Sequence, residues 1–366
     1  MQRRSFLRTA AGAALALPQR HATAAEPGVV PIRLGFDTYS LRAFRWKAMQ
    51  LLDYAASQNV DTIQISNSND YESLEPAHLT RLKEHAAELG IALDAGIGCI
   101  CPTSTSWNAK NGDPVENLAA GLRVAKAIGA RAMRCFMGND KDRLTPAVSR
   151  HMERTIQMLR AVRSQALDSG VMIGLENHAG DMQAREVRTV IEEAGKDFAG
   201  ACLDTGNPMW VVEDPMVTLE VLAPYVVTSH IRDSVVYEDP RGARAQWVAL
   251  GDGTIDFKAF LARYRELCPK ASMQLEIITG RPPRVLPYLE PDFWKAFPKA
   301  NAAEFAEFVA LARRGRPFSG FMVIEDGAKQ SPGEYKAALR QQQRIDLERS
   351  LEYAKKVLGV GVRWRG

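Results

Sequence analysis

The sequence predicts an α/β fold, a (β/α)8 TIM barrel with an insertion between strand eight and the last helix. Two observations predict it. From residue 31 onward, short apolar segments alternate with amphipathic helical segments, and eight such units in sequence suffice to close a barrel. The alternative, an open doubly wound sheet, would need a glycine-rich phosphate turn after an early strand, and none follows the first strand.

The predicted strands are short apolar runs, typical of parallel strands that are buried on both faces. They span Ile32–Tyr39, Thr62–Ser66, Ala92–Cys99, Ala132–Met137, Val171–His178, Ala199–Asp204, Val226–Arg232 and Met273–Ile278. Between them, apolar residues recur at helical spacing. The predicted helices are Met49–Ser57, Ala77–Leu89, Val115–Ile128, Val148–Ser169, Ala184–Ala194, Pro215–Ala223, Phe257–Leu267 and Tyr335–Val357. Asp214 and Ser331 each precede a proline, which predicts a capped helix start with that proline as the first helical residue.

About fifty residues, 281–333, separate strand eight from the last helix. They are rich in proline and aromatic residues and contain a predicted helix, Ala302–Arg313. Because loops that follow barrel strands open on the catalytic face, we expect this insertion to form a lid over the site. The alternative is an excursion packed on the outside of the barrel.

Residues 1–24 are predicted to be a twin-arginine export signal, which leaves 25–366 as the barrel domain. Arg3-Arg4 precede an apolar run from Ala10 to Leu17, and Ala22-Thr23-Ala24 is typical of a cleavage site. The apolar run is shorter than the roughly 20 residues that span a bilayer, so no stable membrane insertion is expected after cleavage. We therefore expect a periplasmic or otherwise exported protein.

The charge of the chain excludes one class of partner. The chain carries 47 basic and 43 acidic residues, a formal charge of +4. The predicted signal holds four arginines and no acidic residue, so the rest of the chain is formally neutral. A neutral domain without a basic run has no field that attracts nucleic acid, and no nucleic-acid partner is expected. The five cysteines are odd in number and lie mostly in predicted strands, which predicts buried thiols.

Four consecutive predicted strands end in an ionisable residue among apolar neighbours: Glu176, Asp204, His230 and Glu276. Side chains at the carboxyl ends of barrel strands converge on one face, and period-two alternation directs these four toward the barrel axis. Three carboxylates this close would repel one another and lose hydration. One divalent cation would offset both costs.

The predicted cofactor is therefore one divalent metal ion. Three oxygens and an imidazole suit Mn²⁺, with Mg²⁺, Co²⁺ and Zn²⁺ as alternatives. The competing interpretation is that arginines of the barrel, such as Arg134 or Arg232, neutralise each acid separately.

Longer motifs surround these residues: Leu175–His178, Leu203–Asn207, His230–Asp233, Gly251–Phe257 and Leu275–Glu276. With these motifs the sequence resembles the xylose isomerase-like barrels, a sugar isomerase/epimerase superfamily that also contains inosose dehydratases, hydroxypyruvate isomerases and endonuclease IV. The resemblance covers nearly all of the chain after the predicted signal. It implies that the four residues bind the metal. It also implies that Glu176 and Glu276 move protons on opposite sides of a keto sugar.

The sequence departs from this superfamily in two places. In its epimerases a histidine often stands three residues after the strand-six aspartate, where this chain has Asn207. That puts a ketose 3-epimerase activity in doubt. Endonuclease IV uses three zinc ions and several more histidines than the two found in these motifs, so DNA repair is not expected.

The predicted substrate-binding residues are His178, Asn207, Arg232 and Trp247. His178 is also a predicted catalytic residue beside Glu176, and it either donates a proton or supports the carboxylates. Arg232 either holds a substrate oxygen or neutralises neighbouring acids. Trp247 either stacks on a sugar ring or packs inside the protein.

These inferences predict a metal-dependent isomerase or epimerase that acts on a sugar or polyol carbonyl through an enediolate, with a small carbohydrate as its substrate. One alternative is a metal-dependent lyase that acts on a keto-glycoside by β-elimination. Another is a non-catalytic periplasmic sugar-binding protein. The oligomeric state stays open.

Overall fold

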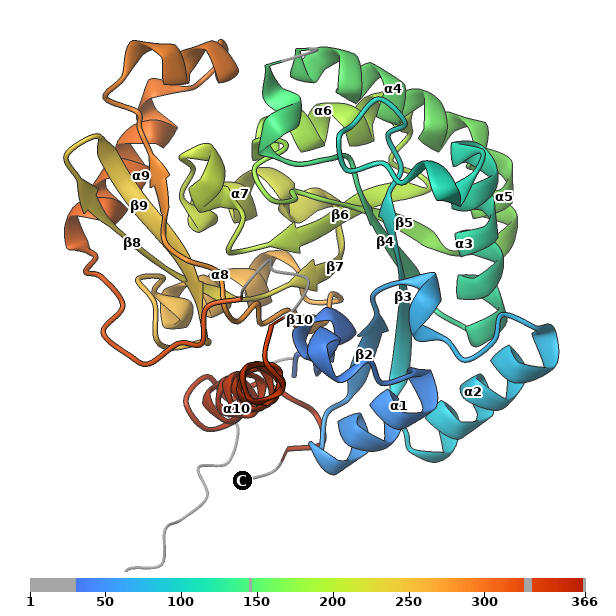
Figure 1. Ribbon diagram of the computed structural model, residues 1–366. Helices are drawn as coiled ribbons and strands as arrows, with labels where there is room; N and C mark the ends of the chain where they lie inside the picture. The colour runs from blue at the N-terminus through green and yellow to red at the C-terminus, as the bar shows by residue number, and fades with distance from the viewer. Residues whose placement is uncertain (1–30, 145–146, 326–330, 365–366) are drawn as a thin grey trace, which may run out of the picture. The chain divides into compact units, whose positions relative to one another are not determined.

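The chain winds around a barrel of eight parallel strands, which confirms the predicted fold class (Figure 1). The computed structural model describes residues 31–144, 147–325 and 331–364. The predicted export signal lies outside the described residues. Those residues belong to one compact unit. No helix in the described ranges is both long and apolar enough to cross a bilayer.

All eight predicted strands occur. They are β1 (Leu34–Asp37), β2 (Thr62–Ile65), β3 (Ala92–Cys99), β4 (Ala132–Phe136), β5 (Met172–Glu176), β6 (Ala199–Asp204), β7 (Val226–His230) and β10 (Met273–Leu275). Several end earlier than predicted, because the backbone past the strand bonds within its own loop. The amide of His178, for example, donates to Asp181 Oδ1 at 2.9 Å.

The strands follow the order β10-β1-β2-β3-β4-β5-β6-β7. Between β7 and β10 the pairing shrinks to one parallel bridge, Ile231 with Leu275. Two backbone hydrogen bonds accompany it, from Ile231 N to Gln274 O at 2.7 Å and from Glu276 N to Ile231 O at 3.1 Å. The barrel is thus nearly closed, and we call this narrow join between β7 and β10 the seam.

Helices cover the outside of the barrel (Figure 1). They are α1 (Ala48–Ser57), α2 (Pro76–Glu88), α3 (Pro114–Ile128), α4 (Val148–Ala161), α5 (Arg163–Ser169), α6 (Ala184–Ala194), α7 (Pro215–Leu222), α8 (Phe257–Leu267) and α10 (Gly333–Lys356). The predicted helix over 148–169 is wrong in one respect: it is two helices, because buried Val162 leaves helical dihedral angles (φ −107°, ψ 9°).

Of the two predicted capped starts, one is confirmed. Asp214 accepts a hydrogen bond from Met216 N, and α7 begins at Pro215. By contrast α10 begins at Gly333, with Pro332 in the cap position rather than in the first turn. The five cysteines are buried free thiols, as predicted.

A second sheet of three strands stands beside the barrel, and the sequence analysis missed it. The hairpin of β8 (Asp233–Asp239) and β9 (Gly242–Val248) directly follows β7. Strand β11 (Arg284–Leu286), from the predicted insertion, pairs with β9. The insertion continues through a 3-10 helix, Pro291–Ala296, to α9 (Ala302–Arg314), which agrees with the predicted helix. The insertion therefore folds together with a hairpin from another loop rather than alone.

The insertion is anchored to the loop after β4. Arg284 Nη2 pairs with Asp140 Oδ2 at 2.5 Å, and Arg143 Nε donates to Ala296 O at 3.0 Å. These contacts place parts of the insertion beside the carboxyl ends of the strands. Its function as a lid stays a prediction.

Candidate metal centre

Four polar side chains meet at the carboxyl end of the barrel. Glu176, Asp204 and His230 are the last residues of β5, β6 and β7, and Glu276 directly follows β10. One donor atom from each residue lies within 4.8 Å of the donor atoms of the other three. The structure thus brings together all four residues that the sequence analysis proposed as ligands. This geometry is consistent with the prediction that the four residues bind a metal ion.

The cluster is screened from solvent. Glu176, Asp204 and His230 are fully buried, and Glu276 is 3% exposed. His230 Nδ1 lies 3.5 Å from Glu176 Oε1 and from Glu276 Oε2, yet no described residue forms a hydrogen bond with it. A buried ring nitrogen that lacks a hydrogen-bond partner and faces carboxylate oxygens is well placed to bind a metal ion.

Two buried arginines contact the same carboxylates. Arg134 Nε donates to Glu176 Oε2 at 2.5 Å, and Arg232 pairs with Asp204 Oδ2 and Glu276 Oε2. The loop after β6 makes room for Arg232, since a Cβ at Gly206 would lie 2.6 Å from its Cγ. The ion pairs considered as the competing interpretation are therefore present together with the cluster.

The balance of buried charge distinguishes the two interpretations. Asp37, at the end of β1, is a fourth buried carboxylate, and its Oδ2 lies 3.5 Å from His230 Nε2. Four carboxylates thus face two guanidinium groups. Burial acts to lower the pKa of His230, but the carboxylates of Glu276, Glu176 and Asp37 raise that pKa to about 10. Burial, together with the neighbouring Glu176 and Glu276, raises the pKa of Asp204 to about 7. A divalent cation would offset this crowding of negative charge more fully than one imidazolium. The residues therefore fit a divalent metal ion.

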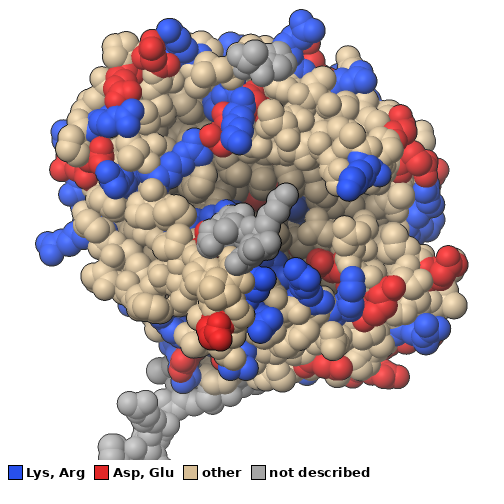
Figure 2. All heavy atoms as spheres, in the orientation of Figure 1, with Lys and Arg blue, Asp and Glu red and all other residues tan. Residues whose placement is uncertain are grey.

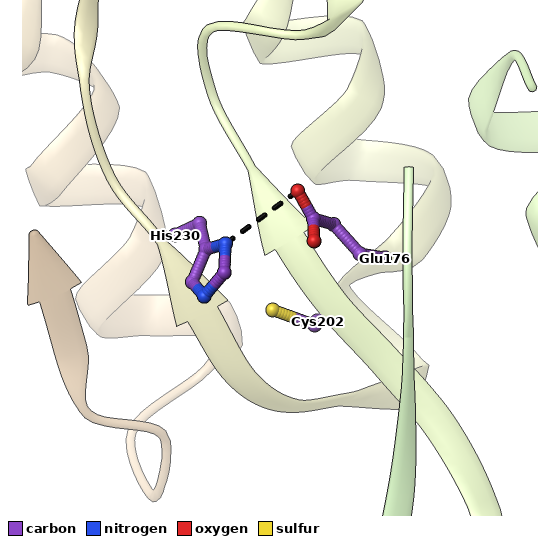
Figure 3. Close-up of side chains that lie close together, drawn as sticks. All are labelled: Glu176, Cys202 and His230. Carbon is purple, nitrogen blue, oxygen red and sulfur yellow. Dashed lines mark ion pairs between the residues drawn. The ribbon is translucent and has the colours of Figure 1, made fainter. Parts of the chain in front are cut away.

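Cys202 lies beside the cluster, and the sequence analysis did not single it out. Figure 3 shows Glu176, Cys202 and His230 on neighbouring strands with their side chains close together. The Cys202 sulfur lies within 4.8 Å of donor atoms of Glu176 and His230. Burial raises the pKa of this thiol well above its ordinary value, which favours a neutral thiol. Its position two residues before Asp204 on one strand was the signal that could have revealed it.

Two predicted substrate-binding residues flank Glu176. Asn207 Nδ2 donates to Glu176 Oε1 at 3.1 Å, while its Oδ1 is buried without a hydrogen bond from the described residues. The ring of His178 stacks on Phe136 with centroids 3.8 Å apart. His178 Nδ1 lies 2.7 Å from Gly138 O, a distance at which it donates. Burial lowers the pKa of His178, so we expect a neutral ring whose Nε2 can accept a proton.

Trp247 is a buried residue of β9. Its ring stacks on Trp210 with centroids 4.4 Å apart, and the Arg232 guanidinium carbon lies 4.5 Å from the Trp247 ring centroid. Its Nε1 donates to Gly206 O at 3.1 Å. These contacts fix the position of Arg232. A sugar contact for Trp247 stays a prediction.

The surface near the strand ends is hollowed and basic. Figure 2 shows a hollow near the centre of the face in view, with lysine and arginine side chains around it. After β1 and β2 there is also a cavity of about 450 Å³, whose lining includes Tyr39, Arg42, Trp46 and Asp70. None of the four cluster residues lines this cavity.

The sequence of this barrel matches a known protein family. Residues 52–290, more than half of the chain, match the model of the xylose isomerase-like TIM barrel. The chain belongs to this family. The resemblance stated from the strand-end motifs is thereby confirmed at the level of the family.

Relatives within and around the xylose isomerase-like family act on sugars. A 3-oxo-isoapionate decarboxylase of Pectobacterium atrosepticum is 26% identical over 238 residues, which cover 62% of this chain and 78% of the relative. A solved D-psicose 3-epimerase superposes with a TM-score of 0.56 at 15% identity and covers 90% of this chain and 100% of its own. A 3-keto-D-glucoside 4-epimerase of E. coli gives 0.53 at 15% identity and covers 76% and 98%. The barrel therefore belongs to a family of enzymes, and several of its relatives modify sugars.

Proposed function

We propose that this xylose isomerase-like chain is a divalent-metal-dependent isomerase or epimerase that enolises the carbonyl of a sugar or polyol. The observation that carries the proposal is the cluster of Glu176, Asp204, His230 and Glu276, with more negative charge around it than its arginines neutralise. These four residues would hold the ion. Once bound, a divalent ion supplies Lewis-acid stabilisation of the negative charge that develops on a carbonyl oxygen.

Glu276 is the carboxylate best placed to move a proton. Glu176 is engaged on both oxygens, by Arg134 on Oε2 and by Asn207 on Oε1. Glu276 pairs with Arg232 through Oε2, and its Oε1 has no hydrogen-bond partner among the residues the structure describes. Its side chain is 4% exposed. Glu276 would therefore take the proton next to the carbonyl, and neutral His178 is a second candidate for this proton.

Arg232 and Asn207 would bind and orient the substrate. The guanidinium of Arg232 lies between Asp204 and Glu276 and is held against Trp247. It can donate to a substrate oxygen that reaches the cluster. The unpartnered Oδ1 of Asn207 can accept a hydrogen bond from a substrate hydroxyl.

A lyase is the second candidate, and two observations favour it. The relative from Pectobacterium atrosepticum is a decarboxylase, and Asn207 occupies the position where epimerases of this superfamily often have histidine. Loss of CO₂ from a 3-oxo acid and β-elimination from a keto-glycoside both pass through an intermediate with negative charge next to a carbonyl. A divalent ion held by the same cluster would stabilise that charge, and the basic rim of the hollow would favour an acidic substrate.

Solvent-deuterium incorporation tests the proposal. The metal-loaded protein is incubated in D₂O with candidate 2-keto and 3-keto sugars, and label at the carbon next to the carbonyl is measured by NMR. We expect the wild type to catalyse exchange. We expect Glu276→Gln to slow it by about 10²- to 10⁴-fold, because the proton acceptor is lost. Glu290→Gln, on the insertion surface, is the matched control and should exchange like the wild type.

The outcomes separate the candidate functions. Exchange without loss of any fragment from the sugar supports isomerase or epimerase chemistry, while release of CO₂ or an aglycone supports a lyase. Tight binding with no exchange would instead support the sugar-binding alternative. Full exchange by Glu276→Gln would remove this residue from the mechanism.

A further inference from the structure

We propose that Gln64, itself oriented by Thr228 and Asp94, positions His230 so that its Nδ1 is the nitrogen available to a metal ion. The inference rests on the proposed metal-dependent function and deepens it. It assigns a task to three polar residues deep in the barrel that no part of the proposed reaction uses.

A continuous chain of hydrogen bonds joins these residues. His230 Nε2 and Gln64 Oε1 are 2.5 Å apart. Gln64 Nε2 donates to Thr228 Oγ1 at 3.1 Å, and Thr228 Oγ1 donates to Asp94 Oδ2 at 2.9 Å. Gln64, Thr228 and His230 are fully buried, so no bulk water competes for these bonds.

The direction of the chain follows from the chemistry of its members. The Asp94 carboxylate accepts, so the single hydroxyl proton of Thr228 is committed to it. The oxygen of Thr228 must then accept from Gln64, which points the amide nitrogen of Gln64 toward Thr228. The carbonyl oxygen of Gln64 is thereby turned toward His230, where it accepts the Nε2 proton.

This direction decides which ring nitrogen can bind a metal ion. A ring that keeps its proton on Nε2 has its lone pair on Nδ1, the atom that faces Glu176 and Glu276. If the Gln64 amide were reversed, its nitrogen would donate to Nε2 and the ring proton would move to Nδ1. That proton would point into the cluster and compete with a cation. Outer partners of this kind typically change metal affinity 10- to 100-fold.

The barrel holds the chain of bonds rigidly. Gln64 is paired in register with Asp94 on the neighbouring strand β3. Thr228 and His230 lie two residues apart on β7, so they occupy successive layers of the interior. Asp94 accepts a second, longer contact from Gln274 Nε2 at 3.5 Å, which also ties the chain to β10.

One other acceptor lies near His230 Nε2. Asp37 Oδ2 is 3.5 Å away, farther than the oxygen of Gln64. Its other oxygen caps the turn after β1 by accepting from Tyr39 N. If Gln64 did not accept the proton of His230 Nε2, Asp37 would therefore be the residue that accepts it.

The experiment measures Zn²⁺ affinity of the full-length protein by competition with a chelator. Gln64→Met keeps the length of the side chain but removes both hydrogen bonds, and we expect a 10- to 100-fold weaker affinity. Gln64→Glu keeps an acceptor for His230 Nε2 but loses the donor to Thr228, and it should bind Zn²⁺ more tightly than Gln64→Met. Gln343→Met is the matched control, since Gln343 is an equally buried glutamine that bonds to Ala43 N instead. It should bind Zn²⁺ like the wild type.

A second readout is independent of affinity. Long-range ¹H–¹⁵N spectra of the zinc-loaded wild type should show a proton on His230 Nε2 and none on Nδ1. Thr228→Val, which frees the Gln64 amide to turn, provides a milder variant in case Gln64→Met fails to fold. We expect it to weaken Zn²⁺ binding several-fold.

Each outcome has one meaning. A wild type that binds no Zn²⁺ contradicts the proposed metal-dependent function itself. A wild type that binds Zn²⁺, with Gln64→Met binding equally well, overturns only the positioning inference and assigns the task to Asp37. Equal losses in Gln64→Met and Gln343→Met, or in Gln64→Met and Gln64→Glu, would also overturn it, since the effect would then be one of packing.

Discussion

Glu213 is a buried acid outside the metal cluster. It accepts hydrogen bonds from Thr218 Oγ1 at 2.5 Å and from Ala184 N at 3.2 Å. These bonds stabilise the charged form only in part, and burial raises the pKa of Glu213 to about 7. The folded protein therefore keeps this proton at a pH where the unfolded chain has lost it.

The consequence is a pH-dependent stability. As the pH rises from the ordinary carboxyl range to about 7, the contribution of Glu213 to the free energy of unfolding falls by on the order of 3 kcal/mol, and it stays low above that pH. We expect Glu213→Gln to remove this slope, so that urea unfolding at pH 8 shows a gain relative to the wild type. Glu220→Gln, an exposed pair partner of Arg263, should leave the slope unchanged. An identical slope in Glu213→Gln and wild type would refute the assignment.

Single residues also show what the sequence can and cannot predict about the site. Glu176, Asp204, His230 and Glu276 were identifiable because the carboxyl ends of parallel strands must converge. Gln64, Asp94 and Cys202 were not identified. Gln64 and Asp94 both bond to Thr228, which lies on a strand distant in the sequence. Cys202 was overlooked although it lies two residues before Asp204 on the same strand. Pairing across the barrel interior is set by register and shear, which single-strand patterns do not contain.

At the scale of elements, the three-stranded sheet depends on a close approach between α9 and β8. Gly315 ends α9, and a Cβ at this position would lie 1.6 Å from Val236 O in β8. The backbone of β8 cannot yield without disturbing its pairing with β9. Glycine is therefore required at this contact for steric reasons.

We expect Gly315→Ala to destabilise the sheet of β8, β9 and β11 by about 1–3 kcal/mol. Hydrogen exchange should rise in these strands and stay unchanged in the barrel strands. Gly333→Ala, at the start of α10, meets no atom within 4 Å and is the matched control. Unchanged exchange in β8 after Gly315→Ala would show that the contact is not tight.

The same elements explain where the fold prediction fell short. The barrel strands could be predicted because each lies beside its neighbour in sequence. The hairpin of β8 and β9 could not be recognised, since its apolar face packs on Phe308 and Leu311 of α9, more than fifty residues farther along the chain. That long-range contact, rather than local propensity, determines its structure.

At the scale of the whole molecule, a bound ion should stabilise the fold. An ion that binds only the folded state at 100 times its dissociation constant adds about 2.7 kcal/mol to the free energy of unfolding. We expect Mn²⁺ to raise the melting temperature and a chelator to reverse the rise. In Asp204→Asn the rise should shrink, whereas Asp239→Asn, at the end of β8 and paired with Arg244, should respond like the wild type. Equal responses would exclude Asp204 as a ligand.

The location of the molecule in the cell stays a prediction. Residues 1–24 lie outside the described part of the chain, and export rests on the twin-arginine motif alone. Free thiols suit either side of an inner membrane when they are buried as deeply as these five.

The seam has a further consequence. His230 lies on one edge of it and Glu276 on the other, and the backbone pairing of those edges is limited to one bridge and its two hydrogen bonds. An ion bound by both residues would link β7 and β10 across the seam, where the barrel has the least backbone pairing. Binding of the ion and closure of the seam would then be coupled. A fluctuation that separates the two strands would also release the ion.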